Sequence, residues 1–154
     1  MREQISLLLR DTEVTLGVNW IYLPAGLRLC YVLVLPVQGT VAIFLASLAL
    51  ASRDPSLTPA LLALNALATA AAPPLARAVA LHHFKLDPNL ANLTTGMLIK
   101  LALLFGLFST SLHQAFYAFI GREPAFLAMW IGDVLGALLC LYGLRGLAMV
   151  VRRG

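Results

Sequence analysis

The chain has 154 residues, of which 60% are hydrophobic and only 12% are charged. A globular domain usually has about 45–50% apolar and about 25% charged residues, so these few charges cannot cover a water-exposed surface. The composition therefore argues against a soluble enzyme and against a nucleic-acid-binding protein. The net charge is +4, from eleven basic and seven acidic residues. In so apolar a chain, this excess of basic residues indicates arginines that flank membrane spans. We predict a single integral membrane domain.

The predicted fold is an all-α, polytopic membrane bundle. Residues 1–17 are expected to form an interfacial lead-in, and residues 18–151 the helical bundle. A transmembrane helix needs about 20 mostly apolar residues. On this criterion we predict five transmembrane helices, over residues 18–35, 37–52, 57–81, 93–120 and 124–151.

Prolines interrupt two of these segments. Pro24 and Gly26 weaken the first helix, because proline removes a backbone donor, and we predict a break near Pro24–Gly26. The first segment stops at Pro36 and the second starts at Val37, so the two must form a tight helical hairpin or a re-entrant pair. The pair Pro73-Pro74 predicts a kink in the third helix, or its early end near Ala72.

Basic residues near helix ends indicate which side of the membrane is cytoplasmic. With five spans, the two sides carry similar numbers of basic residues. Arg152 and Arg153 form the densest cluster. We therefore predict that the C-terminus lies in the cytoplasm.

Ionisable side chains inside spans are costly and mark candidate functional sites. Three qualify here: Arg28, Lys100 and Asp133. At about 1.5 Å per residue, Arg28 lies about 15 Å and Asp133 about 13 Å from the starts of their segments. With five spans both starts lie on one side, so the two residues share a layer, which Asn65 joins. We predict an Arg28–Asp133 ion pair that locks the first helix to the fifth; the alternative leaves Arg28 available to an anionic ligand.

Helical spacing extends this layer. Lys100 shares a helix face with Gln114, whose end of the helix is near the Arg28–Asp133 layer. Trp130 lies close to Asp133 and either anchors the helix at the membrane interface or stacks on a ligand. His113 points about 220° away from Lys100 and is expected to face headgroups or a neighbouring helix. The candidate ligand-binding residues are Arg28, Asn65, Gln114, Trp130 and Asp133.

Two glycines in the last segment predict close helix packing. Gly132 and Gly136 have the spacing that lets membrane helices approach one another, within one chain or in a homo-oligomer. Neither Cys30 nor Cys140 has a metal-ligand spacing, and the adjacent histidines His82-His83 lack an evident third ligand. We expect no metal, no cofactor and no enzymatic activity.

Two patches resemble the MASE-type, or membrane-associated sensor, domains of bacteria. The first patch is residues 23–29, Leu-Pro-Ala-Gly-Leu-Arg-Leu, and the second is residues 129–138, which contain Trp-Ile-Gly-Asp-Val-Leu-Gly. Members of that family have eight spans and precede a kinase, cyclase or phosphodiesterase module, whereas five spans are predicted here. The resemblance implies a multi-pass sensor of a bacterial inner membrane.

The sequence leaves three functions open. The first is a sensor or ligand-binding membrane module without catalysis, which signals through a separate partner. The second is an accessory subunit of a larger membrane complex, and the third is a small-solute transport component. The expected partners are the lipid bilayer and either a membrane protein or a second copy of the chain, but no nucleic acid.

Overall fold

The computed structural model describes residues 13–15, 18–19, 22–90, 92–122 and 125–151. These residues form five helices, preceded by a short antiparallel pair of strands, β1 (Glu13–Thr15) and β2 (Val18–Asn19). The predicted all-α bundle is therefore confirmed. The helices are α2 (Leu23–Val34), α3 (Pro36–Ala51), α4 (Pro59–His83), α5 (Thr95–Phe119) and α6 (Phe126–Val151).

Three of the helices, α4, α5 and α6, are long and apolar enough to cross a membrane. The ends of these helices lie within two residues of the ends predicted for the last three segments. Pro124, the predicted start of the fifth segment, lies outside the described residues. The early end predicted near Ala72 is wrong, because α4 continues through Pro73 and Pro74 to His83.

The two N-terminal helices differ more from the prediction. At 12 and 16 residues, α2 and α3 are shorter than the about 20 residues that a straight span needs. The first helix begins at Leu23, since Val18 and Asn19 belong to β2. The break predicted near Pro24–Gly26 is wrong, because Pro24 lies in the first turn of α2, where its missing N–H costs no helical hydrogen bond.

The real break lies between α2 and α3. Leu35 leaves the helical conformation (φ −127°, ψ 78°), as expected for a residue that precedes a proline. Gly39 then packs against the α2 backbone, where an added Cβ would lie 2.9 Å from the carbonyl oxygen of Tyr31. The absence of a side chain at Gly39 therefore allows α3 to fold back beside α2.

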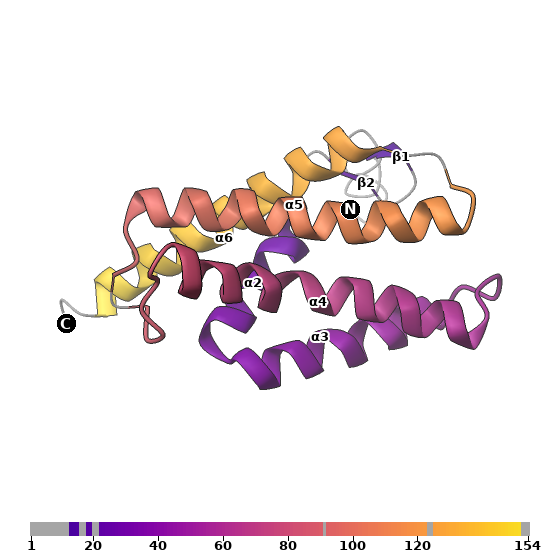
Figure 1. Ribbon diagram of the computed structural model, residues 1–154, viewed down its shortest axis with the longest axis horizontal. Coiled ribbons are helices and arrows are strands. Elements are labelled where there is room, and N and C mark those ends of the chain that lie inside the picture. The colour runs from indigo at the N-terminus through magenta and orange to yellow at the C-terminus, as the bar shows by residue number, and fades with distance from the viewer. Residues whose placement is uncertain (1–12, 16–17, 20–21, 91, 123–124, 152–154) are drawn as a thin grey trace, which may run out of the picture.

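The five helices close into a ring. Consecutive helices pack against one another, α3 against α4, α4 against α5 and α5 against α6, while α2 contacts α6, α3 and α4. Figure 1 shows α3 to α6 running beside one another in alternating directions. The core between them is built from the alanine face of α4 and larger side chains of α5, among them Ala72, Ala76, Leu101 and Phe105. Small residues on α4 allow close approach of its neighbours.

Polar turns define the two ends of the bundle. At one end, residues 52–58 and 120–122 meet, and Arg122 lies 3.9 Å from Asp54. Hydrogen bonds from the hydroxyl and the N–H of Ser56 lower the pKa of Asp54. At the other end lie residues 84–90 and 92–94 and the C-terminal part of α6, where Arg145 donates to the Thr95 hydroxyl over 2.6 Å.

Helix caps explain where the long helices start and stop. The hydroxyls of Thr58 and Thr94 accept N–H groups in the first turns of α4 and α5. After α5, Gly121 adopts a positive φ of 71°, and the N–H of Arg122 binds the carbonyl of Tyr117 at 2.9 Å. This is a Schellman ending, which suits glycine because it has no Cβ to clash.

Candidate functional site

Among the residues whose burial is described, five polar ones are buried inside this apolar bundle, and we refer to them as the core polar cluster. They come from three helices: Thr69 of α4, Ser109, Thr110 and His113 of α5, and Asp133 of α6. Polar side chains in such an interior are costly unless they are hydrogen-bonded. Their partners therefore show which of them serve structure and which are available to a ligand.

His113 joins α5 to α4. Its Nδ1 lies 2.8 Å from the carbonyl oxygen of Ser109, which can only accept, so Nδ1 carries a proton. Its Nε2 lies 3.2 Å from the hydroxyl of Thr69, and that hydroxyl also lies 2.9 Å from the carbonyl oxygen of Asn65. In the neutral imidazole, Nε2 and the Asn65 carbonyl therefore share the single hydroxyl proton of Thr69. This series of hydrogen bonds links α4 to α5 at the level of the cluster.

Asp133 is the acidic member of the cluster and is 1% exposed. The Ser109 hydroxyl and, at longer range, the Arg28 guanidinium lie near its carboxyl group. Among the described residues, however, its Oδ2 has no hydrogen-bond partner. A buried carboxylate oxygen without a partner is unusual and calls for an explanation.

Two further polar atoms beside Asp133 share this property. The Thr110 hydroxyl and the Trp130 indole N–H are buried and have no hydrogen-bond partner in the described part of the chain. Trp130 packs on Gly106, where an added Cβ would lie 3.2 Å from its ring. Thr110 lies one turn after Gly106, and Asp133 less than one turn after Trp130, so all three groups lie along the contact between α5 and α6. The remaining unpartnered buried atom, Nε of Arg77, belongs to α4.

The predicted Arg28–Asp133 ion pair does not form. Across the described residues, the one contact between opposite charges within 4 Å joins Arg122 to Asp54. Arg28 instead donates to the hydroxyl of Tyr22 at 3.0 Å, and its guanidinium lies 5.2 Å from the centre of the Tyr22 ring. The reason is directional: helical side chains point back toward the N-terminus of their helix, and Tyr22 immediately precedes α2.

The other two predicted ligand residues lie at the margins of the cluster. Asn65 joins it through the backbone carbonyl that faces Thr69. Gln114 ties α5 to the start of α6, since its Oε1 accepts from Ala125 at 3.3 Å and its Nε2 lies 3.7 Å from the Met129 sulfur.

Gly132 and Gly136 lie where α2 meets α6. The N–H of Tyr22 donates to the carbonyl of Gly132 at 3.1 Å, and a Cβ on Gly136 would overlap the carbonyl of Tyr22. From the opposite side, a Cβ on Gly26 would lie 2.7 Å from the Cys140 sulfur. The two backbones therefore touch, and this contact places Arg28 and Asp133 near each other.

His113 faces a neighbouring helix, α4, through Thr69, which was one of the two expected orientations, but it also belongs to the core polar cluster. Sequence reasoning had placed it outside the polar layer. It used Lys100 as the reference for the inward face of α5, whereas Lys100 is exposed and His113, about 220° away, is buried. The better reference is the run of small and polar residues Gly106, Ser109 and Thr110, one turn before His113, all of which are buried.

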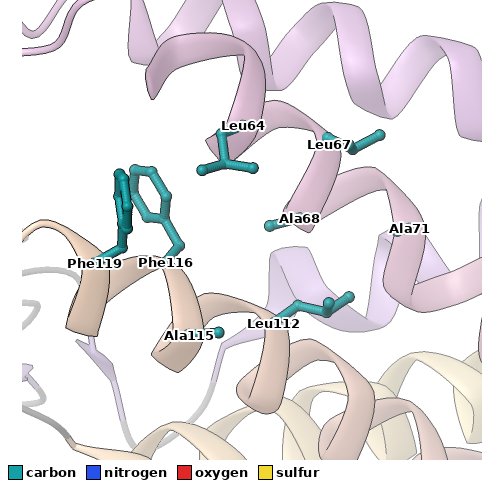
Figure 2. A pocket seen from close by; sticks show the side chains of 8 residues that line it. All are labelled: Leu64, Leu67, Ala68, Ala71, Leu112, Ala115, Phe116 and Phe119. Carbon is teal, nitrogen blue, oxygen red and sulfur yellow. The ribbon is translucent and has the colours of Figure 1, made fainter. Parts of the chain in front are cut away.

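A separate pocket between α4 and α5 is entirely apolar. Figure 2 shows Leu64 of α4 opposite Phe116 and Phe119 of α5, with Leu67 further along α4, and the volume of the pocket is about 360 Å³. Such a lining suits hydrocarbon. It offers no hydrogen-bonding group to a polar ligand, so the core polar cluster and not this pocket is the candidate site.

No set of three metal-ligating side chains occurs among the described residues, and Cys30 and Cys140 are free thiols. No protein-family model, curated protein or solved structure matches this chain. The resemblance to membrane-associated sensor domains therefore stays a prediction from two sequence patches.

Proposed function

We propose that this chain is an integral membrane module that binds a small polar ligand inside its helix bundle. In this proposal it has no catalysis of its own and passes the binding event to a separate partner. The observation that carries the proposal is the set of unpartnered polar atoms on Asp133, Thr110 and Trp130 at the contact between α5 and α6.

The donors and acceptors define the class of ligand. The Asp133 oxygen accepts, the Trp130 indole donates, and the Thr110 hydroxyl does either. A molecule with at least one donor and one acceptor would complete all three groups. A buried polar atom without a partner costs about 1–3 kcal/mol, so such a ligand stabilises the bundle as it binds. That gain gives the module two states, empty and occupied, that a partner can distinguish.

The membrane setting is also part of the proposal. Three helices long enough to span, with polar turns at both ends, support a multi-pass protein. We place α2 and α3 in the same membrane as a hairpin that brings the number of membrane segments to five. The C-terminal end carries Arg77, Lys85, Lys100 and Arg145 against the single acid Asp87 among its described residues, which supports a cytoplasmic C-terminus. A bacterial inner membrane follows from the resemblance alone.

The test is to identify what the protein carries. We expect mass spectrometry of the full chain, purified in mild detergent, to detect a bound small polar molecule. Thr110→Val should reduce its retention about two- to tenfold, the effect of one hydrogen bond. This variant should fold normally, because it removes a hydroxyl that has no partner in the described chain. Asp133→Asn should reduce retention as well, whereas the exposed-loop control Asp54→Asn should not.

Equal retention in all four proteins, or a wild-type protein without any bound polar molecule, would contradict ligand binding at this site.

A second candidate function is an accessory subunit of a larger membrane complex. The observation that favours it is the exposed apolar surface on the two short helices, including Leu27 and Tyr31 of α2 and Val37 and Leu45 of α3. Purification with a stoichiometric protein partner and without a small molecule would support this function. The third function, transport of a small solute, would use the same cluster as its binding site.

A further inference from the structure

A groove on the outer surface of α5 differs from two other pockets of the described residues because a lysine is among its lining residues. Its volume is about 400 Å³, and we call it the Lys100 groove. Its lining residues are Phe84, Lys100, Leu103, Leu104, Leu107 and Trp130. The pocket between α4 and α5 (Figure 2) and a third one between α3 and α4 have no charged lining residue.

The charge lies at one end of the groove. Lys100 is in the second turn of α5, and its ammonium lies 5.4 Å from the centre of the Phe84 ring, just beyond the end of α4. Because helical lysines extend back toward the N-terminus, the ammonium reaches toward the polar turn 84–94. From there the groove continues along leucines to Leu107 and Trp130, about 10 Å further along the helix axis. The groove is therefore cationic at the membrane surface and apolar toward the membrane interior.

The surroundings of Lys100 leave room for an anion and favour it. Gly96, one turn earlier on the same face, is exposed, and an added Cβ there would meet nothing within 4 Å. The Arg145 guanidinium binds Thr95 at the same end of α5. Lys85 adds a third cation in the adjoining turn, where Asp87 is the one described acid.

From this charge complementarity we propose that the Lys100 groove binds one anionic phospholipid. Its phosphate lies against the Lys100 ammonium beside Gly96, and one acyl chain fills the leucine-lined part toward Trp130. A basic residue near the membrane surface strengthens binding of an anionic headgroup by about fivefold. Trp130 also belongs to the proposed polar-ligand site, but the phosphate is assigned to Lys100 and Gly96, so substitutions at different residues test the two proposals.

The test titrates the full chain, in mild detergent, with phosphatidylglycerol and with phosphatidylcholine of the same acyl chains, and counts bound lipids by native mass spectrometry. We expect the wild type to prefer phosphatidylglycerol, and Lys100→Gln to lose about fivefold of that preference. Lys100→Arg should keep the preference. So should Arg53→Gln, which removes an exposed charge at the opposite end of the bundle.

Two further measurements distinguish binding of the whole lipid from binding of its headgroup alone. Glycerol 3-phosphate in excess should not displace phosphatidylglycerol, because the acyl chain supplies much of the binding. Leu107→Trp, at an exposed position that narrows the groove, should weaken binding of both lipids. Equal affinity for the two lipids, a preference that survives Lys100→Gln, or displacement by glycerol 3-phosphate would overturn the proposal.

Discussion

At the scale of residues, the hydrogen bond from Arg28 to Tyr22 changes which residue we assign as the partner of this arginine. Its place in one layer with Asp133 stays a prediction from segment lengths, and the ion pair expected from that layer does not form. Its hydrogen-bond partner was not predictable, because the choice depends on where α2 begins. With the helix starting at Leu23, the nearest acceptor behind Arg28 is the Tyr22 hydroxyl at 3.0 Å. An arginine keeps its charge in a protein, so losing this partner leaves a cation poorly satisfied.

A double-mutant cycle distinguishes the two partners. We expect Tyr22→Phe to lower the free energy of unfolding by about 1.5–3 kcal/mol, the value of a hydrogen bond to a charged group, while the ring contact remains. The coupling free energy between Arg28→Gln and Tyr22→Phe should exceed the coupling between Arg28→Gln and Asp133→Asn. Unfolding of each variant in the same detergent gives both values. A larger coupling with Asp133 would restore the direct ion pair.

At the scale of elements, the lengths of the apolar segments and the polar turns between them predicted the long helices well. About 20 apolar residues bounded by polar turns leave few structures other than a spanning helix. The same features predicted the first helix poorly, because a proline is compatible both with a break and with a first turn. The helix faces were the weakest part. Lys100 has a long stem that lies on the outer surface with its charge at the membrane edge, so it does not indicate the inward face of α5.

The contact between α2 and α6 allows a matched test on one helix. Gly136→Ala places a methyl group against the Tyr22 backbone, which cannot move aside without shifting α2. We expect it to lower the free energy of unfolding by about 1–3 kcal/mol, as for overpacked cores. Gly143→Ala meets nothing within 4 Å and should be neutral or slightly stabilising. Equal effects of the two substitutions would show that α2 does not touch α6 at Gly136.

At the scale of the whole molecule, the ring of five helices accounts for the location of the polar groups. The hydrogen-bonded turns are at the two ends, and the core polar cluster lies between them, on α5 and on the two helices packed against it, α4 and α6. Since Gly132 and Gly136 lie at the contact with α2, a homo-oligomer would use other surfaces, such as the open position at Gly143. The core polar cluster can bind a ligand as proposed only if these helices cross a membrane, since water would otherwise compete for the same polar atoms.

Membrane topology is therefore the most direct test. Single cysteines at Arg53, Lys85 and Arg122, in a chain without Cys30 and Cys140, can be labelled in intact and in opened cells with a membrane-impermeant maleimide. We predict that Arg53→Cys and Arg122→Cys are labelled from one side of the membrane and Lys85→Cys from the other, since α4 and α5 separate these positions. Labelling of Arg53→Cys and Lys85→Cys from the same side would contradict a spanning α4, and with it a ligand site inside the membrane.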